Sequence, residues 1–427
     1  MRKGRVKSDV SEYELGLDDA TGLALVIATI RGAGQISRPK VVHQTGFSRT
    51  LASKYIDFAL SSGLLYEGKL GRSTGGRAPR LLEFNPMAGT LLIAELGASG
   101  LRVAISDLSG NLSQVQSFDT EISLGPELVL AQVESAFDAI IVERKIKNIW
   151  GVGIGLPGPV EFAAGIPMSP PIMPGWDRYP VRKRFADKYR APVWVDNDVN
   201  LMALGEHVTF PEKKSDELIY IKIGSGIGAG ILTHGRLHRG AQGCAGDIGH
   251  IAISEKTDVV CRCGNVGCLE SVVGGIALAR DALGAIAEGK SKFLTLRKKT
   301  NKIITARDVT EGAKSGDKWC VDAINNVGNQ VGRILAMLVN FHNPSLIVIG
   351  GGVSAAGDQL LASIRETVFR RSLPLATRDL EIRLGVNDDS VGLKGAAEMV
   401  ISELFKADFL KQWINAGRPA GLHSHVS

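Results

Sequence analysis

The sequence contains few cysteines, few aromatic residues and no long apolar segment. It has five Cys and 6% aromatic residues in 427 positions, and three of the Cys lie between positions 261 and 268. A disulfide framework is therefore not expected, whereas clustered Cys indicate a metal site. No apolar run reaches the roughly 18 residues needed to cross a bilayer, and the charged N-terminal segment is unlike a signal peptide. We expect a cytoplasmic protein that has no membrane partner.

The sequence also lacks an excess of either charge outside its N-terminal segment. The first 80 residues contain 13 Lys/Arg and 7 Asp/Glu, whereas the remainder contains 37 of each. This excess indicates an anionic partner for the N-terminal segment, with duplex DNA the obvious candidate, although a basic segment can also serve solubility alone. The length and a hydrophobic content of 44% predict two or three folded units.

The N-terminal segment has the pattern of three helices followed by a β-hairpin. The capping signals of Ser37, Gly46 and Ser48 predict where the second helix begins and ends and where the third begins. The predicted helices span 21–30, the stretch between Ser37 and Gly46, and 49–61, and the predicted strands span 64–67 and 80–84. This order is that of a winged helix-turn-helix, with the loop 68–79 as the wing. Helices that bind another protein, beside a solvated loop, are the alternative.

Polar side chains on the third helix form the candidate DNA-reading surface. Its buried face is predicted to consist of Leu51, Tyr55, Phe58 and Leu60. An arginine at the wing tip, after Gly75 and Gly76, is placed to enter an A·T-rich minor groove. The candidate DNA-binding residues are Arg38, Ser48, Arg49, Thr50, Ser53, Lys54 and Arg77.

The rest of the chain alternates apolar strands with helical stretches, which is typical of layered α/β domains. Strands are predicted over 91–94, 150–155, 193–195, 218–223 and 346–349. Two of them are followed by glycine turns, at 95–99 and 224–228, and two such turns that face each other can hold the phosphates of a nucleotide. Either turn alone is a weak signal, because most glycine turns bind nothing.

Together with the cysteine block, the second glycine turn becomes part of a specific pattern. Gly226-Ile227-Gly228-Ala229-Gly230-Ile231 is followed by Ala245-Gly246-Asp247-Ile248-Gly249-His250 and by Cys261-Arg262-Cys263-Gly264-Asn265-Val266-Gly267-Cys268-Leu269-Glu270. This pattern resembles the signature of the ROK family of repressors and sugar kinases. The resemblance covers nearly the whole chain and includes the stretches 155–160, 196–200, 343–344 and 349–354. The N-terminal block with Gly75-Gly76-Arg77 resembles the repressor branch, in particular regulators of the xylose and N-acetylglucosamine type.

The resemblance implies a fold and a division into domains. It implies an α/β chain in which a winged helix-turn-helix at 1–86 precedes a two-lobed actin-like fold, the sugar-kinase-like (ribonuclease H-like) ATPase fold. The first lobe is expected at 87–200 and the second, with the cysteine loop, at 201–427. The C-terminal helix is expected to return to the first lobe, and the protein is expected to be a homodimer or homotetramer.

Three thiolates in one loop indicate a zinc site. Cys261, Cys263 and Cys268 lie close in sequence, and His250 is the expected fourth ligand by its chemistry and by the family resemblance. Four protein ligands leave no open position, so we expect one structural zinc ion per chain. Reduced cysteines in a core are the alternative, which the polar residues around them disfavour.

The resemblance also implies a sugar site. The candidate sugar-binding residues are Gly158, Asn197, Asp198, Asp247, His250 and Glu270. In the family, the position of Asp198 also supplies the base that deprotonates the attacking hydroxyl. A metal-bound His250 can present its second N–H to a sugar hydroxyl. Asp247 stands where the family's kinases usually have Glu, so its shorter side chain should lengthen or lose one hydroxyl contact.

The first phosphate loop departs from the kinase pattern of the family. Kinases read Asp-x-Gly-Gly-Thr where this chain reads Glu95-Leu96-Gly97-Ala98-Ser99. A longer carboxylate and an added methyl crowd the magnesium and phosphate site. We therefore expect sugar binding without efficient phosphoryl transfer, with Asp198 as a vestigial base.

These features favour a repressor that binds operator DNA and responds to a sugar, amino sugar or sugar phosphate. An ATP-dependent sugar kinase with an appended DNA-binding domain is the second hypothesis. A regulator controlled by another protein, with a vestigial sugar pocket, is the third. ATP turnover separates the second hypothesis from the first, and a sugar-induced thermal shift separates the third.

Overall fold

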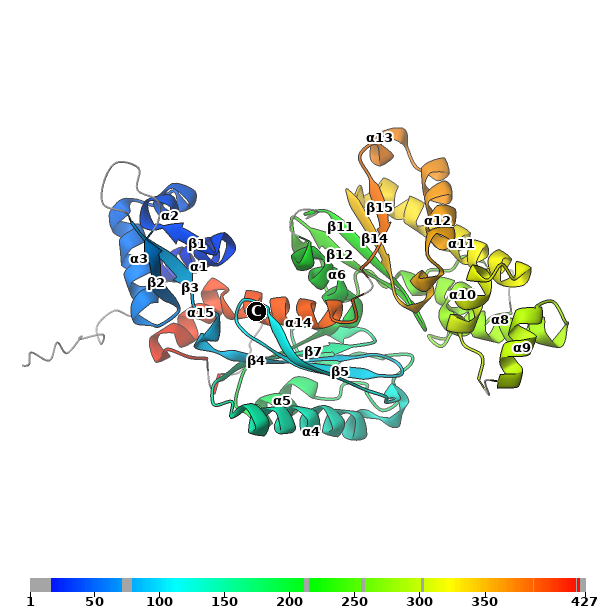
Figure 1. The fold of residues 1–427 in the computed structure, drawn as a ribbon, viewed down its shortest axis with the longest axis horizontal. Helices are drawn as coiled ribbons and strands as arrows, with labels where there is room; N and C mark the ends of the chain where they lie inside the picture. Colours follow the sequence, from blue (N-terminus) through cyan, green and yellow to red (C-terminus); the bar gives the residue numbers. More distant parts are fainter. Residues whose placement is uncertain are drawn as a thin grey trace, which may run out of the picture.

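The computed structural model describes residues 17–70, 79–210, 215–254, 258–300, 303–386, 388–419 and 421–422. A helical N-terminal unit precedes two five-stranded sheets, each covered by helices (Figure 1). Within these described ranges, no helix is long and apolar enough to cross a membrane.

Three helices and a small sheet form the N-terminal unit (Figure 1). Its elements are α1 (Leu17–Ala33), β1 (Gln35–Ser37), α2 (Arg38–Thr45), α3 (Arg49–Ser61), β2 (Leu65–Leu70) and β3 (Arg80–Phe84). Gly46 ends α2 in the left-handed conformation, with φ 71°, and Ser48 caps α3 by accepting from the backbone N–H of Leu51. β3 pairs antiparallel with both β1 and β2. This order of helices, turn and hairpin is that of a winged helix-turn-helix.

Smaller side chains than expected form the buried face of α3. The buried residues of this helix are Ala52, Tyr55, Ile56 and Ala59. The prediction was right for Tyr55 and wrong for Leu51, Phe58 and Leu60, which are only half-buried. These three side chains still pack against the edge of the same core. The centre of the face lies at Tyr55, where α1 comes so close that a Cβ on Gly22 would lie 2.4 Å from the tyrosine ring.

The first large sheet has the strand order β10-β7-β4-β5-β6. Its strands are β4 (Thr90–Leu96), β5 (Leu101–Ser106), β6 (Leu112–Phe118), β7 (Ile149–Leu156) and β10 (Val193–Asn197). β4, β7 and β10 are parallel, and β5 and β6 extend the sheet as antiparallel strands. Helices α4 (Pro126–Arg144) and α5 (Val181–Tyr189) cover one face, and α14 (Val391–Leu404) covers the other (Figure 1).

The second large sheet repeats this arrangement in the order β13-β12-β11-β14-β15. Its strands are β11 (Leu218–Ile223), β12 (Ile227–Thr233), β13 (Arg236–Leu237), β14 (Leu346–Gly350) and β15 (Glu381–Leu384). β11, β14 and β15 are parallel, and β12 and β13 are antiparallel, as in the first sheet. In both sheets a glycine turn follows the first strand. This repeat is the topology of the two-lobed sugar-kinase-like fold.

Helices cover both faces of the second sheet. Helix α6 (Asp198–Thr209) lies on one face. Four helices share a hydrophobic core with the other face, namely α7 (Leu269–Val273), α10 (Ala306–Lys314), α11 (Lys318–His342) and α12 (Asp358–Arg371). Helices α8 (Gly275–Ala287) and α9 (Lys292–Thr300) pack against α10, farther from the strands (Figure 1). The short helix α13 (Pro374–Thr377) precedes β15. Each sheet is therefore buried on both sides, as expected for parallel strands.

Helices α6 and α14 cross with their backbones in contact. A Cβ on Gly205 would lie 1.8 Å from the carbonyl oxygen of Val391, and a Cβ on Gly395 would lie 1.7 Å from that of Leu201. Only glycine permits this approach. The predicted boundary at residue 200 lies within α6, which contacts both the second sheet and α14. The division into lobes stays a prediction, but the two sheets are joined through these helices.

The N-terminal unit shares a hydrophobic core with the C-terminal helices. Helix α15 (Ala407–Trp413) packs along α1. The ring of Phe84, at the end of β3, contacts that of Phe405, which follows α14, at a centroid distance of 5.8 Å. The ring of Trp413 of α15 contacts that of Trp150 of β7 at 5.1 Å. This core is continuous from the N-terminal helices to the back of the first sheet. The N-terminal unit can therefore move relative to the first sheet only if buried contacts are broken.

Candidate functional site

A cleft of about 1270 Å³ opens between the two sheets. Both glycine turns line it, one between β4 and β5 and one between β11 and β12. Each turn is closed by a backbone hydrogen bond, from Gly97 N–H to the oxygen of Gly100 at 2.8 Å and from Gly224 N–H to that of Gly226 at 2.9 Å. The cleft is larger than the roughly 300–1,000 Å³ of most small-molecule pockets. It has room for more than a monosaccharide.

The six candidate sugar-binding residues come together in this cleft. They are Gly158, Asn197, Asp198, Asp247, His250 and Glu270. They come from the loop after β7, the junction of β10 and α6, the loop after β13 and the start of α7. A sugar needs several polar groups around its ring, and this convergence supplies them on one concave surface.

The turn from β10 into α6 fixes the direction of Asn197. Its Oδ1 accepts from the backbone N–H of Val199 at 2.9 Å and so caps α6. Its Nδ2 donates to the carbonyl oxygen of Gly158 at 2.9 Å. The amide is thus oriented by the fold before any ligand arrives, and Gly158 contributes by holding it.

A buried carboxylate behind this turn supports it. Asp196 is 1% exposed, and its Oδ2 accepts from Nε of Arg239 at 2.8 Å. The guanidinium of Arg239 lies over the ring of Phe162, 3.7 Å from its centroid. Asn200 donates to the other oxygen of Asp196 at 2.9 Å. This network fixes the backbone from which Asp198 enters the cleft.

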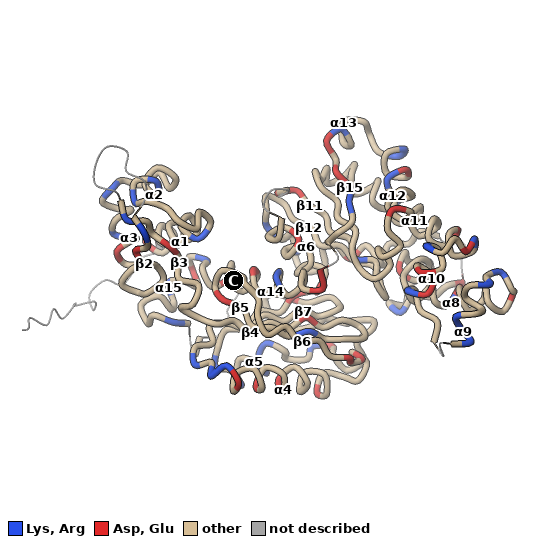
Figure 2. The backbone as a smooth tube through the Cα atoms, in the orientation of Figure 1, with Lys and Arg blue, Asp and Glu red and all other residues tan. Residues whose placement is uncertain are grey.

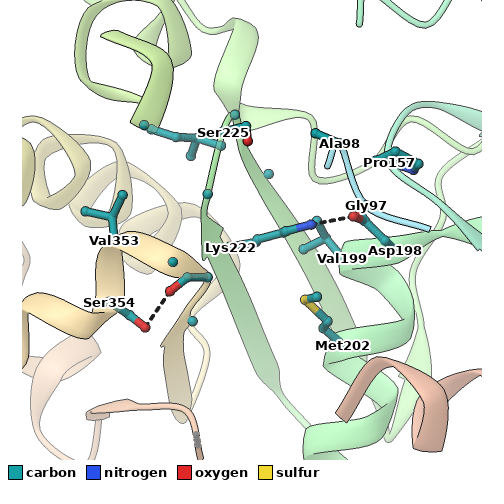
Figure 3. A pocket seen from close by; sticks show the side chains of 18 of the residues that line it. Gly97, Ala98, Pro157, Asp198, Val199, Met202, Lys222, Ser225, Val353 and Ser354 are labelled. Atoms are coloured by element: carbon teal, nitrogen blue, oxygen red, sulfur yellow. Dashed lines mark hydrogen bonds and ion pairs between the residues drawn. The ribbon is translucent and has the colours of Figure 1, made fainter. Parts of the chain in front are cut away.

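The carboxylate of Asp198 meets the ammonium of Lys222 across the cleft (Figure 3). Lys222 Nζ donates to Asp198 Oδ2, and the Asp198 side chain is 4% exposed. Burial opposes the charge of Lys222, but the charge and hydrogen bond of Asp198 outweigh it and raise the pKa of Lys222. Lys222 therefore keeps its charge, and its ion pair with Asp198 joins β11 to the start of α6.

The carboxyl group of Glu95, at the end of β4, is almost completely buried. Burial raises its pKa to about 7, although the charges of Lys222 and Arg102 favour ionisation. Among the described residues its Oε2 has no hydrogen-bond partner, and Nη1 of Arg102 is 3.8 Å away. A carboxyl group that is partly protonated near neutral pH is a weak ligand for magnesium, which prefers ionised carboxylates.

The other two carboxyl groups of the cleft differ in their surroundings. Oε2 of Glu270 accepts from the backbone N–H of Ile227 at 3.1 Å, so Glu270 supports the second glycine turn. Asp247 lines the cleft with a partly exposed side chain, and partial burial raises the pKa of its carboxyl group. The proposed loss of a hydroxyl contact at Asp247 stays a prediction.

One histidine and three cysteines form a cluster that can hold a metal ion. The ligand atoms of His250, Cys261, Cys263 and Cys268 all lie within 4.8 Å of one another. The sulfurs of Cys263 and Cys268 are 3.7 Å apart, and Cys261 Sγ is 3.5 Å from His250 Nδ1. A tetrahedron with bonds of about 2.3 Å to sulfur and about 2.05 Å to nitrogen gives separations of about 3.8 and 3.6 Å. The spacing therefore fits a tetrahedral ion.

His250 connects the metal cluster to the cleft. Its Nδ1 faces the thiolates, and its Nε2 lies 3.8 Å from Oδ1 of Asp247. An ion bound at Nδ1 would fix the ring and leave Nε2–H directed at the cleft.

The candidate DNA-binding residues lie on and beside α2 and α3, except Arg77, which lies outside the described residues. Ser48, Arg49, Thr50 and Lys54 are exposed, and Arg38 and Ser53 are half-buried. Lys54 Nζ pairs with Asp19 at 2.8 Å, and Arg38 pairs with Asp57 at 2.8 Å. Acidic as well as basic segments thus lie on this unit (Figure 2). Arg49 has no ion-pair partner in the part of the chain that the structure describes.

Sequence reasoning missed two cations that line the cleft, Lys222 and Arg102, and Arg239, which supports the turn behind it. Their partners are distant in sequence or on another strand, so no local motif marks them. For Lys222 a signal existed, because it is the one charged residue of the apolar strand Leu218–Ile223. A charged side chain in a buried strand indicates a partner or a function.

Comparisons with known proteins match both parts of the chain. A family model described as ROK family matches residues 92–403. A xylose repressor from Caldicellulosiruptor bescii is 32% identical over 89% of this chain and 95% of its own length. The regulator NagC from Escherichia coli is 26% identical over 85% of this chain and 90% of its own length. A glucokinase from Halalkalibacterium halodurans is 30% identical over 72% of this chain and 93% of its own length.

Solved structures show the same two groups. A ROK family transcriptional regulator, described as a homologue of the E. coli MLC protein, covers 94% of this chain and 100% of its own, with a TM-score of 0.81 and 25% identity. A ROK family glucokinase from Streptomyces griseus, in complex with glucose and AMPPNP, covers 73% of this chain and 99% of its own, with a TM-score of 0.63 and 27% identity. A match over 94% of the chain necessarily includes most of the N-terminal unit.

Proposed function

The chain belongs to the ROK family, and from this premise we propose that it is a sugar-responsive transcriptional repressor. Its winged helix binds operator DNA, and its cleft binds a sugar, amino sugar or sugar phosphate of carbohydrate metabolism. The observation that carries this proposal is that the N-terminal unit and the cleft contact the same helix, α14. The similarity to a xylose repressor over 89% of the chain supports it.

Helix α14 begins at the cleft. Asp388, Asp389 and Val391 line the cleft at the start of this helix. Gly392 packs against Glu95 so closely that a Cβ would lie 2.4 Å from its carboxyl carbon. A ligand that rearranges this wall of the cleft therefore acts directly on the first turn of α14.

The same helix ends at the N-terminal unit. Arg31 of α1 pairs with Glu398 of α14 at 2.5 Å, and both side chains are largely buried. Leu404, the last residue of α14, belongs to the core that contains the N-terminal helices. At about 1.5 Å per residue, α14 is about 21 Å long. We assign to it the transmission of cleft closure to the spacing of the DNA-binding units.

On DNA, we place α3 in the major groove and the wing in the minor groove. We assign Arg49 to a base edge, because it is exposed and no described acidic residue pairs with it. Lys54 and Arg38 would exchange their surface partners for phosphates, which costs little because exposed ion pairs are weak. Ser48, Thr50, Ser53 and Arg77 complete the proposed interface.

We propose that the metal is one structural zinc ion per chain. Cys261, Cys263, Cys268 and His250 would supply all four ligands, which leaves no open position for catalysis. Zinc would hold the three thiolates and the ring of His250, and so keep Nε2 directed at the sugar. The metal then serves the effector response as well as the stability of the loop.

The cleft binds its sugar without efficient phosphoryl transfer. Glu95 is buried with a pKa of about 7, and Ala98 and Ser99 stand where the kinase pattern has glycine and threonine. The retained Asp198 and a glucokinase relative of 30% identity favour a second candidate, a sugar kinase that carries a DNA-binding unit.

We propose that the repressor is at least a homodimer. Exposed apolar side chains gather where α11, α12 and α13 meet, namely Met337, Phe341, Phe369, Leu373 and Leu375. Asn340 of α11 accepts a hydrogen bond from the backbone of Leu373 at 3.0 Å, which places these segments side by side. We assign the patch to a second copy of the chain, because two winged helices related by symmetry read two half-sites.

A thermal-shift screen of neutral sugars, amino sugars and sugar phosphates tests the proposal, with ATP turnover measured for every hit. We expect at least one sugar to raise the melting temperature and turnover to stay below about 1 s⁻¹, the lower end for kinases. Faster turnover would favour the kinase. If no sugar changes the melting temperature of the stable protein, the hypothesis of control by another protein would be favoured.

A further inference from the structure

The cation that pairs with Asp198 is a side chain of the protein, Lys222. Lys222 projects from β11 and donates to Oδ2 of Asp198, the carboxylate in the position of the family's base (Figure 3). Asp198 is thus in direct contact with Lys222, and the charge of Lys222 also lowers the pKa that burial raises at Glu95.

A charged lysine in a buried strand costs free energy of folding unless its ammonium group is paired. Its strand lies between two others in the second sheet, and the remaining residues of Leu218–Ile223 are uncharged and buried. An ammonium in such a place needs a partner. Within the described ranges, Asp198 is the hydrogen-bond partner of Nζ, so the pair across the cleft accounts for a lysine at this position.

The charge that Lys222 supplies is of the kind that phosphotransferases obtain from a bound ion. In such enzymes a divalent cation that arrives with the nucleotide neutralises carboxylates and phosphates. Here one oxygen of the carboxylate that would accept the proton of an attacking hydroxyl already accepts from Lys222. A metal ion at Asp198 would be repelled by the ammonium group of Lys222 at contact distance.

We propose that Lys222 is a specificity-determining residue that takes the place of the metal–nucleotide at Asp198. The cleft therefore binds its sugar with neither a divalent cation nor a nucleotide. This inference rests on the proposed sugar-binding function, but its first consequence does not need the sugar. Without Lys222, Asp198 loses the cation that pairs with it, and a divalent cation can take that place.

The first experiment measures Mn²⁺ binding to the zinc-loaded full chain, with no nucleotide or sugar, by electron paramagnetic resonance. Lys222→Met should bind Mn²⁺ about tenfold or more tightly than the wild type, because a charge at contact distance has been removed. Lys222→Arg should bind as weakly as the wild type. Lys314→Met is the matched control, because Lys314 is an exposed lysine that lines the same cleft elsewhere. A folded Lys222→Met protein with wild-type Mn²⁺ affinity would overturn the proposal.

Lys222→Met leaves Asp198 buried without a partner, which can prevent the variant from folding. A double variant provides a test in that case. Lys222→Met with Asp198→Asn removes both charges, so it should fold and should bind Mn²⁺ no better than the wild type. A double variant that gains Mn²⁺ affinity would mean that the metal binds away from Asp198, against the proposal.

The second experiment uses the wild-type chain and a sugar identified by thermal shift. Its dissociation constant for the sugar should change less than about twofold when Mg²⁺ and AMPPNP are added, since Lys222 already supplies the charge they would bring. Markedly tighter sugar binding with Mg²⁺ and AMPPNP would contradict the role of Lys222. If no sugar shifts the wild type, the proposed function fails, while the Mn²⁺ experiment still tests Lys222.

Discussion

Replacement of Glu95 with glutamine removes a buried ionisable group while it preserves the shape of the side chain. Glu95 is 5% exposed, and burial raises its pKa from 4.5 to about 7. The folded chain therefore holds this proton more tightly than the unfolded chain. The contribution of Glu95 to stability falls as the pH rises from about 4.5 to about 7, and it stays at its lower level above that range.

The structure sets the size of the effect. The difference between a folded pKa of about 7 and the ordinary value of 4.5, at about 1.4 kcal/mol for each pH unit, amounts to about 3 kcal/mol. Glu95→Gln stays neutral at every pH, so it avoids this loss. We expect the variant to be more stable than the wild type by up to about 3 kcal/mol at pH 8 and to match it near pH 4.5.

Urea unfolding followed by tryptophan fluorescence measures the difference at pH 5 and at pH 8. Both proteins keep the metal cluster, so its own pH dependence cancels in the comparison. Glu121→Gln is the control, because Glu121 is exposed, and its effect should stay within about 0.5 kcal/mol at either pH. A difference for Glu95→Gln that is the same at both values, or a variant less stable than the wild type at pH 8, would refute the reasoning.

Four further substitutions test other parts of the account. Cys263→Ser should remove the zinc, lower the melting temperature and abolish the sugar response, because His250 loses its anchor; elemental analysis that finds no metal in a wild-type protein that still responds would contradict this. Arg49→Ala should weaken operator binding by roughly 1–3 kcal/mol in a gel-shift titration, and an unchanged affinity would reject the base contact. Asp198→Asn should weaken sugar binding in calorimetry, because it removes a hydroxyl acceptor and leaves Lys222 without its partner; equal affinity would place the sugar elsewhere. Arg31→Ala should leave the sugar affinity unchanged but reduce the effect of the sugar on DNA binding, and an intact response would exclude the contact between α1 and α14 from the coupling.

The sequence predicted the buried parallel strands better than the antiparallel and short ones. The five predicted strands are the buried parallel strands β4, β7, β10, β11 and β14, whose continuous apolar runs are easy to identify. The missed strands include β1 and β13, which have only three and two residues, and β6, which is half-exposed. These strands are short or half-exposed, so their positions depend on pairing with another strand and not on a continuous apolar run.

The candidate site divides in a similar way. The family resemblance implied the candidate sugar-binding residues that the structure brings into one cleft. The cysteine spacing, together with the resemblance, predicted the cluster of His250 with three cysteines. Neither predicted that Lys222 meets Asp198 or that Glu95 is buried, because both facts depend on how the two sheets face each other. On the N-terminal unit, Lys54 was predicted to face outward, and it is exposed. Its ion pair with Asp19 of α1 could not be predicted from the pattern of α3 alone.

The most direct test of the account is DNA binding by the full chain with and without its sugar. DNA fragments selected from genomic DNA by the wild-type protein are labelled, and their fluorescence anisotropy is followed as the sugar found by thermal shift is added. The account predicts binding without the sugar, loss of affinity by a factor of about 5 to 150 when the sugar saturates the cleft, and no selection of DNA by the same protein without its N-terminal unit. Equal DNA affinity with and without a sugar that demonstrably binds the cleft would contradict the claim that this protein is a sugar-responsive repressor.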